Sequence, residues 1–242
     1  RGEADIAVHS LKDVPMELLS GHVIAAIPER ADPRDALVSR RYPSIAALPK
    51  GARVGTSSLR RESQLRSRCK GLVIQPLRGN VPTRVRKLDQ DQYDAIILAA
   101  AGLMRLGLGA RITALLTLEE SLPAAGQGAL GIECRGDRSD ILELLAPLDH
   151  AETASCVRAE RAVARTLAGS CNVPLAAFGQ ITHGTMRLRG YVGSPDGSQV
   201  ARAVVSGEAA EAEALGVALA ARLRHAGADE ILSSLAAGHA GE

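Results

Sequence analysis

The sequence predicts an α/β protein with a small α+β domain at its C-terminal end. Three observations support this prediction. Short apolar runs alternate with helical patterns in the first half, two polar or glycine-rich breaks interrupt them, and the pattern changes after residue 150 to a long helix and three strands. A chain of 242 residues with 46% hydrophobic residues is long enough to bury such a core.

The first half is expected to hold six short strands and three helices. Such alternation is typical of mostly parallel sheets, in which ligands bind at the loops that follow the carboxyl ends of the strands. The strands are expected at Ala4–His9, Val23–Ile27, Ala36–Ser39, Arg53–Gly55, Val73–Leu77 and Ala95–Ala99, and the helices at Ser58–Arg68, Val81–Gln90 and Gly102–Leu106.

Two breaks indicate that one domain is inserted into another. The first break, Glu29–Arg34, is polar and contains a proline. The second, Leu122–Gly128, is rich in small residues. A strand at Ala129–Cys134 and a helix at Ile141–Leu145 are expected to follow it. We expect domain 1 at residues 1–30 and 129–147, domain 2 at 31–128 and domain 3 at 148–242. Domain 3 is expected to hold a long helix from Ala151, strands at Val173–Gln180, Met186–Val192 and Gln199–Val205, and helices at Ala209–Arg224 and Glu230–Leu235.

Composition argues against several classes of protein. Aromatic residues make up 2% of the chain, which weakens any nucleic-acid site that depends on base stacking. No apolar stretch of about 18 residues and no charged-then-apolar leader is present, so a cytoplasmic location is expected. The four cysteines are far apart and lack CxxC spacing, which predicts free thiols rather than a metal site or a disulfide framework.

A strongly basic segment runs from Lys50 to Leu88. It holds three lysines and eight arginines against one acid, Glu62, a net charge of +10 compared with +2 for the whole chain. Solvated helix faces explain part of this charge. The loops Gly55–Arg61 and Arg78–Arg84 each follow a predicted strand and open a helix, where backbone amides favour an anion. GxxxxGK[ST] and GxGxxG are absent, so carboxylates fit as well as phosphate.

The octapeptide Val8–Pro15 follows the first predicted strand and brings together an acid, Asp13, a base, Lys12, and a hydroxyl, Ser10. A carboxylate at a strand end can act in acid–base chemistry or stabilise a cation. Taken alone, however, the octapeptide is more typical of a surface Lys–Asp pair.

Two cysteines are candidates for a reactive thiol. Cys69 lies between arginine and lysine residues and is expected to be the most acidic thiol, whereas Cys171 lies among small residues just past a helix end. Cys134 is expected in a strand core and Cys156 on the buried face of a helix. Local chemistry does not choose between Cys69 and Cys171.

Five segments together resemble the hydroxymethylbilane synthase (porphobilinogen deaminase) family. The similarity extends over the entire chain, and the segments occur in the family's order with similar spacing. They are VHSLKDVP at Val8–Pro15, VGTSSLRR at Val54–Arg61, LRGN at Leu77–Asn80, LPAAGQGALGIECR at Leu122–Arg135 and GSCNVPLAAF at Gly169–Phe178.

The resemblance implies two periplasmic-binding-protein-like α/β domains, with domain 2 inserted in domain 1, and a small α+β C-terminal domain. It also implies a transferase of tetrapyrrole biosynthesis. Such an enzyme deaminates four porphobilinogen molecules, joins them head to tail on a covalent dipyrromethane primer and releases linear hydroxymethylbilane by hydrolysis. Porphobilinogen and its linear oligomers are then the expected partners, without nucleic acid or membrane, and the protein is expected to be a monomer.

The resemblance also assigns roles to residues. Cys171 matches the cysteine that holds the dipyrromethane through a thioether, which favours it over Cys69. Asp13 matches the catalytic aspartate, whose carboxylate stabilises positive charge as ammonia leaves. Further cofactor contacts are expected from Ser10, Lys12, Thr56, Ser58, Arg60, Arg61, Arg78, Arg84 and Gly128. Substrate contacts are expected from Arg78, Arg84, Arg105 and Gln127.

The family has a further N-terminal segment before the part that matches Val8–Pro15, so we expect domain 1 to be incomplete in this sequence. Two other functions remain as alternatives. A non-catalytic, two-lobed anion-binding protein would carry no covalent group on Cys171. A nucleic-acid-binding protein would use the basic segment, but the chain's near-neutral total charge argues against it.

Overall fold

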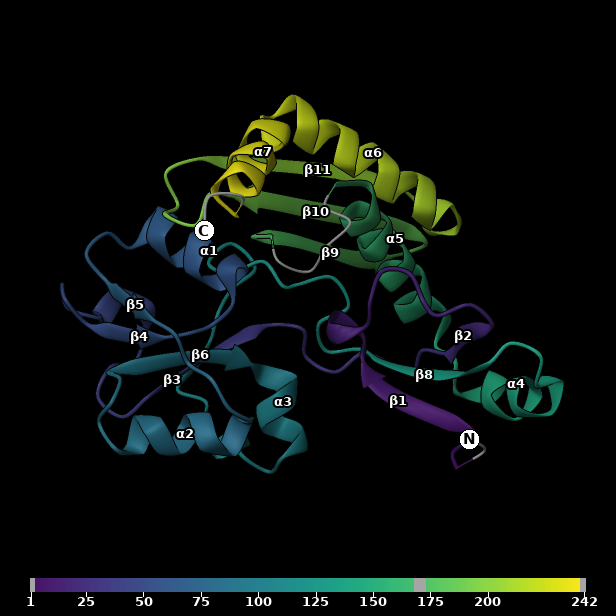
Figure 1. The fold of residues 1–242 in the computed structure, drawn as a ribbon, viewed down its shortest axis with the longest axis horizontal. Coiled ribbons are helices and arrows are strands. Elements are labelled where there is room, and N and C mark those ends of the chain that lie inside the picture. The colour runs from purple at the N-terminus through teal and green to yellow at the C-terminus, as the bar shows by residue number, and fades with distance from the viewer. Residues whose placement is uncertain (1–2, 168–172, 240–242) are drawn as a thin grey trace.

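The computed structural model describes residues 3–167 and 173–239, and this part of the chain holds three β-sheets (Figure 1). The N-terminal sheet has the order β1 (Ile6–Ser10), β8 (Leu130–Arg135), β2 (His22–Ala26), and both of its strand pairs are antiparallel. The helix α4 (Ser139–Leu145) packs against β2 and β8 through Leu145, which contacts the buried Ala26 and Ile132.

The central sheet has five strands in the order β5-β4-β6-β3-β7. Only β4 pairs in parallel, with β5 and with β6, whereas β3 pairs antiparallel with β6 and β7. The bounds are β3 (Asp35–Ser39), β4 (Arg53–Gly55), β5 (Val73–Gln75), β6 (Ala95–Ala99) and β7 (Ala114–Leu115), with helices α1 (Leu59–Arg68), α2 (Val81–Asp89) and α3 (Ala100–Arg105).

The C-terminal sheet is antiparallel in the order β11-β10-β9, and three helices cover one of its faces (Figure 1). Alternate residues of β10, such as Met186 and Leu188, point into the core beneath these helices because side chains alternate along a strand. The bounds are β9 (Leu175–Thr182), β10 (Thr185–Gly193), β11 (Val200–Glu208), α5 (Ala151–Leu167), α6 (Ala212–His225) and α7 (Ala228–His239).

These elements confirm the predicted α/β class and most of the predicted segments. The strands at Arg53–Gly55 and Ala95–Ala99 have the predicted bounds, and the short strand β7 was not predicted. The expectation of mostly parallel strands is wrong for the N-terminal sheet and for β3 and β7. The chain enters the central sheet at β3 and returns to the N-terminal sheet at β8, so these two strands do not follow the strand–helix–strand connections that force parallel pairing. Each runs antiparallel to both of its neighbours. The domain boundaries stay a prediction.

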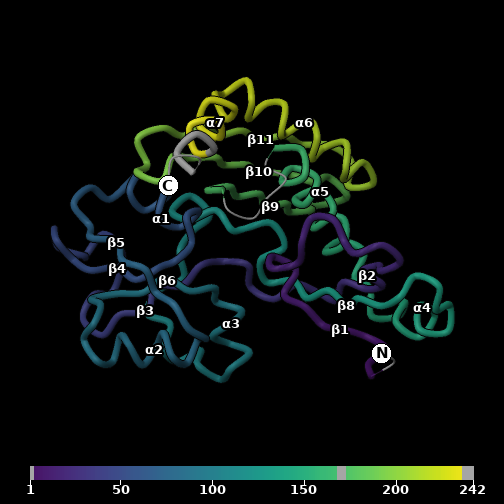
Figure 2. Tube along the Cα trace, in the orientation of Figure 1, coloured from purple at the N-terminus to yellow at the C-terminus, as the bar shows by residue number. Residues whose placement is uncertain are grey.

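The two predicted breaks lie side by side where the chain crosses between the N-terminal and central sheets (Figure 2). Ala31 N donates to Gly128 O at 3.2 Å, and Gln127 Nε2 donates to Pro33 O at 2.6 Å. Gly128 has φ +87°, and a Cβ atom there would lie 2.6 Å from Ala31 O. Only glycine fits this crossing without moving a backbone.

A buried ion pair joins these crossings to the C-terminal sheet. Both oxygens of the fully buried Glu160, on α5, accept from the guanidinium of Arg30, at 2.7 and 2.6 Å. The same carboxylate accepts from Gly126 N, at the second crossing, and from Gly179 N, on β9. One carboxylate therefore connects both crossings with the C-terminal sheet.

None of the helices in the described ranges combines the length and apolar character needed to cross a membrane.

Replacing Glu160 with glutamine is expected to lower the free energy of unfolding by about 3 kcal/mol, because it leaves a buried guanidinium without its counter-charge. Urea unfolding at neutral pH measures the change. Glu213→Gln is the matched control, since Glu213 is exposed and pairs with Arg165 at the surface, where such a pair is worth at most about 1 kcal/mol. Equal losses in the two variants would contradict this account of Glu160.

Candidate active site

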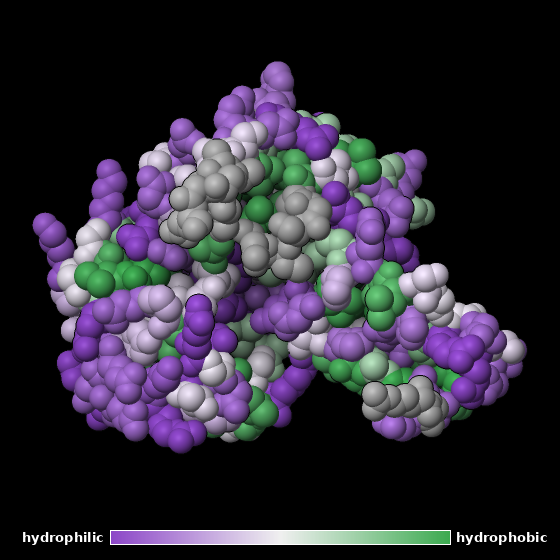
Figure 3. Space-filling view, in the orientation of Figure 1, coloured by the Kyte–Doolittle hydropathy of each residue, from purple (hydrophilic) through white to green (hydrophobic). Residues whose placement is uncertain are grey.

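A cavity of about 750 Å³ lies between the N-terminal, central and C-terminal sheets, and its walls are cationic. Four basic side chains line it: Lys12, Arg60, Arg61 and Arg84. In the space-filling view, hydrophilic residues gather at the centre of the molecule, where its lower left and lower right parts face each other (Figure 3). The charge and size of the cavity suit an organic anion with several carboxylates.

The loop before α1 is held by its own hydroxyl groups. Ser58 is the N-cap, and its side chain accepts from Arg61 N at 3.5 Å. Thr56 Oγ1 accepts from Ser58 N at 3.2 Å, and Ser57 Oγ accepts from Leu77 N at 2.9 Å. The first two bonds satisfy amides at the helix start, and the third ties the loop to the segment that follows β5. The first turn of α1 therefore presents Arg60 and Arg61 to the cavity.

The loop before α2 forms a second helix start at the cavity. Asn80 is the N-cap, its side chain accepts from Thr83 N at 2.9 Å, and Pro82 occupies the first turn. Arg84 Nε donates to Gly79 O at 2.7 Å, which leaves its outer nitrogens for other partners. Burial, followed by the nearby charge of Arg61, lowers the pKa of Arg84.

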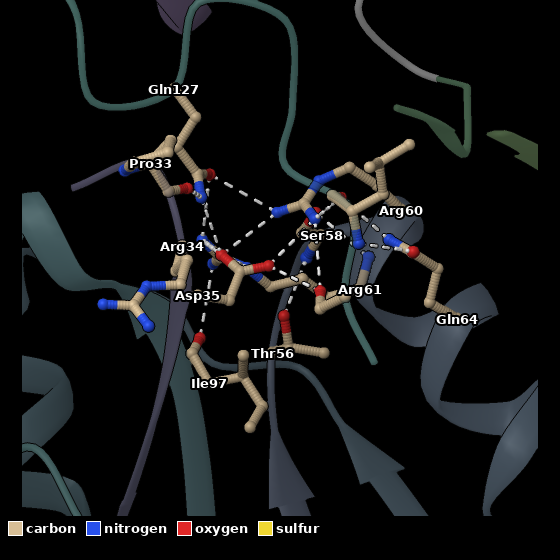
Figure 4. A network of polar contacts seen from close by, with 12 residues as sticks. Pro33, Arg34, Asp35, Thr56, Ser58, Arg60, Arg61, Gln64, Ile97 and Gln127 are labelled. Carbon is tan, nitrogen blue, oxygen red and sulfur yellow. Dashed lines mark hydrogen bonds and ion pairs between the residues drawn. The ribbon is translucent and has the colours of Figure 1, made fainter. Parts of the chain in front are cut away.

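Asp35, the first residue of β3, is the centre of a buried polar network (Figure 4). Its carboxylate is fully buried and lies 2.9 Å from Arg60 Nη1 and 2.8 Å from Arg61 Nη2. It also accepts from Ser121 Oγ at 2.7 Å. Burial alone would raise the pKa of Asp35, but the two guanidinium groups hold it well below its ordinary value. The one negative charge of Asp35 therefore offsets only one of the two positive charges, and the three side chains together keep a net charge of +1.

Gln127 completes this network from the second crossing. Its Nε2 donates to Asp35 Oδ1 at 2.9 Å, and its Oε1 accepts from Arg60 and Arg61 at 3.4 and 3.5 Å (Figure 4). The side chain is buried, and both of its ends are occupied by protein groups. Its bonds position the arginines, and the expected contact with substrate stays a prediction.

Lys12 and Asp13 reach the cavity from the loop after β1. Burial, and then the charge of Arg61, lowers the pKa of Lys12 to about 8. Asp13 is exposed, and its carboxylate has no hydrogen bond or ion pair with any residue in the described ranges. An uncommitted carboxylate therefore lies in a cavity that is otherwise cationic.

The structure brings seven of the predicted site residues to the cavity wall: Lys12, Asp13, Ser58, Arg60, Arg61, Arg84 and Gln127. Five others do not line it: Ser10, Thr56, Arg78, Arg105 and Gly128. Arg78 is exposed, and Arg105 Nη2 donates to Gly128 O at 2.7 Å. Cys171 lies outside the described residues, but Val173, two residues further along, lines the cavity.

The sequence did not reveal the role of Asp35, Ser57 or Asn80. Asp35 begins an apolar strand, and an acid at the start of a buried run is a signal that a buried cation lies nearby. Ser57 and Asn80 line the cavity, and their position just after strands was the available signal. The partners of Asp35 and Ser57 are distant in sequence, so those contacts were not predictable, whereas the partner of Asn80 is only three residues away.

Cys69 was predicted to be the most acidic thiol on the premise that its basic neighbours lower its pKa, and this premise is wrong. Burial raises the pKa of Cys69, and the opposing effect of Arg68 is smaller. Cys134 and Cys156 are buried as predicted, and burial raises the pKa of Cys156 to about 12. All three are free thiols, as expected from their spacing.

Comparison with known proteins gives one consistent family. A family model described as porphobilinogen deaminase, dipyrromethane cofactor binding domain, matches residues 1–143, and one described as porphobilinogen deaminase, C-terminal domain, matches residues 154–225. The porphobilinogen deaminase of Methylobacillus flagellatus is 58% identical over 97% of this chain and 76% of its own length. That of Ralstonia nicotianae is 61% identical over 98% of this chain and 72% of its own length.

Likeness to solved structures is weaker. A lipoprotein of the YaeC family from Enterococcus faecalis has 16% sequence identity and a TM-score of 0.33, covering 56% of this chain and 67% of its own.

Lys12 should titrate near pH 8, because burial and Arg61 disfavour its charged form. The chain has four lysines, so reductive methylation with ¹³C gives few signals to follow by NMR. We expect one signal with a midpoint near pH 8 that is missing from Lys12→Arg. The positive charge of the cavity then falls as pH rises through 8. Absence of such a signal, or its persistence in Lys12→Arg, would disprove the assignment.

Proposed function

The chain belongs to the porphobilinogen deaminase family, and from this premise we propose which of its residues bind and join the pyrroles. It is a transferase that deaminates porphobilinogen and joins four units into linear hydroxymethylbilane on a dipyrromethane cofactor. Porphobilinogen is therefore its substrate. The monomeric state and the cytoplasmic location stay predictions from the sequence.

The cavity suits the dipyrromethane. This cofactor carries acetate and propionate groups, and the cavity offers cationic side chains and helix-start amides at two neighbouring loops. When bound, the dipyrromethane supplies the free pyrrole α-carbon to which the first substrate unit is joined. We propose that Cys171 Sγ holds it by a thioether. The lining of the cavity by Val173 and Leu175 supports this, since Cys171 comes just before them in the chain.

The arginines bind the carboxylates of the cofactor and of the growing chain. Arg60 and Arg61 are held by Asp35, so they meet a ligand in fixed positions and lose little side-chain entropy on binding. Arg84 and Lys12 have no carboxylate partner among the described residues and supply most of the uncompensated charge. The exposed Arg78 and Arg105 are proposed to meet later units of the chain.

Three predicted cofactor contacts act from behind the cavity wall. Thr56 and Gly128 support the loop before α1 and the crossing beside Gln127, and Ser10 ends β1 just before Lys12. We propose that they contribute by holding these segments.

Asp13 is proposed as the catalytic residue, and its free carboxylate in a cationic cavity is the observation that most supports this role. When the C–N bond of porphobilinogen breaks, ammonia leaves and the pyrrole becomes cationic. Asp13 accepts a hydrogen bond from the pyrrole N–H and stabilises this charge. The free α-carbon of the terminal pyrrole attacks the methylene carbon that has lost ammonia, and this attacking α-carbon then loses its proton, which Asp13 is placed to accept.

Asp13→Asn is expected to reduce porphobilinogen consumption by about a hundredfold or more, since amide oxygen stabilises a cation far less than carboxylate does. Asp140→Asn, at an exposed site on α4, is the control and should be unaffected. Turnover of Asp13→Asn at the wild-type rate would remove Asp13 from the mechanism.

Intact mass spectrometry tests the attachment to Cys171. The wild-type protein and the control Cys69→Ser should both carry a dipyrromethane-sized adduct, and Cys171→Ser should carry none. An adduct that persists in Cys171→Ser would contradict the attachment to Cys171.

A further inference from the structure

A second basic site lies beside the same helix α1, nearer its C-terminal end than the catalytic cavity. It is a groove of about 210 Å³ between the C-terminal sheet and the segment formed by α1 and residues 118–122. In Figure 1 the helix α1 lies below the left-hand ends of the strands of this sheet. The groove holds the arginines Arg68, Arg187, Arg189 and Arg202 against a single acid, Glu119.

The alternation of β10 and β11 puts these arginines on one face. Met186 and Leu188 point into the core under α5 and α6, so Arg187, Arg189 and Tyr191 point the other way. Arg202 is the cross-strand neighbour of Tyr191, and its guanidinium lies 5.3 Å from the centre of the Tyr191 ring.

Most of the positive charge of the groove arginines has no acidic partner. Glu119 Oε1 pairs with Arg189 Nη1 at 3.0 Å. Within the described part of the chain, Arg68, Arg187 and Arg202 have no hydrogen bond or ion pair. The Nε of Arg189 is buried and also lacks a hydrogen-bond partner. Buried donors are normally satisfied, so an unsatisfied guanidinium nitrogen among three unpaired cations indicates a place for an anion.

The floor of the groove is apolar. Leu118, Leu122 and the buried Tyr191 belong to one hydrophobic cluster, and Val204, 41% exposed, lies beside them. A bare inorganic anion would leave this surface unused. A flat organic body with carboxylates at its edge would cover the floor and reach the guanidinium groups.

We propose that this groove binds a small organic polycarboxylate at a site separate from the catalytic cavity. The two sites share one wall. Leu122 O accepts from Arg60 Nη1, which faces the cavity, and from Gln64 Nε2, which lines the groove. The side chains that bind the ligand are different, with Arg187 and Arg202 in the groove and Lys12 and Arg84 in the cavity.

Calorimetric titration of the cofactor-loaded protein with benzene-1,3,5-tricarboxylate tests the proposal. We expect saturable binding that Arg187→Ala/Arg202→Ala weakens by at least about tenfold, because two charge-assisted contacts are lost. Arg86→Ala/Arg158→Ala removes the same charge from exposed helix positions away from the groove, and it should bind as the wild type does. Thermal unfolding checks that each variant is folded.

A cavity variant and two other probes identify the site and the ligand class. Lys12→Ala/Arg84→Ala should keep the binding, since these residues do not line the groove. Loss in this variant, with retention in Arg187→Ala/Arg202→Ala, would assign the binding to the catalytic cavity and overturn the proposal. Benzoate should bind much more weakly. If pyrophosphate binds as tightly as the tricarboxylate, the claim that the ligand is organic is overturned. If the tricarboxylate shows no saturable binding, the claim that the groove is a binding site is overturned.

Discussion

The buried carboxylate of Asp35 is the interaction on which the catalytic cavity depends. Two adjacent arginines at a helix start would repel each other, and burying both of them costs free energy unless a counter-charge is present. Asp35 supplies that charge from a different strand, while Ser121 and Gln127 supply hydrogen bonds from a third segment. The network thereby joins β3, α1 and the second crossing. It leaves a net positive charge that faces the cavity.

Charge balance distinguishes three junctions of the molecule. At Arg30 and Glu160 the charges cancel, and the pair serves to hold the crossings against the C-terminal sheet. Around Asp35 one positive charge remains, and in the groove at the C-terminal half of α1 most of the arginine charge is unpaired. Arginine suits all three, since its planar fork forms paired hydrogen bonds in fixed directions. What differs is how much of the charge is left for a ligand.

The sequence predicted the local features well. Hydrophobic patterns predicted most helices and strands, including the helix starts near Ser58 and Val81. The roles of Cys171 and Asp13 came from the family resemblance and not from local chemistry. For Cys69 local chemistry was misleading, since a count of neighbouring charges does not include burial, which has the larger effect on its pKa.

The features that were missed depend on contacts between distant segments. Asp35 and Arg60 are 25 residues apart, and Arg30 and Glu160 are 130 residues apart. Antiparallel pairing of β3 with β6 arises from the way the chain enters the central sheet, which no local period encodes. The basic groove combines a helix, a loop and two strands whose arginines are individually typical of exposed positions. Only the fold reveals that they share one surface.

The most direct test of the role of Asp35 is the free energy of unfolding of Asp35→Asn compared with Asp137→Asn. Asp137 is an exposed acid that pairs with Arg135 at the surface, so its loss should leave stability nearly unchanged. Asp35→Asn leaves two buried guanidinium groups without a counter-charge, and we expect a loss of about 3–5 kcal/mol. A stability for Asp35→Asn equal to that of Asp137→Asn would contradict the claim that this carboxylate holds the cavity together.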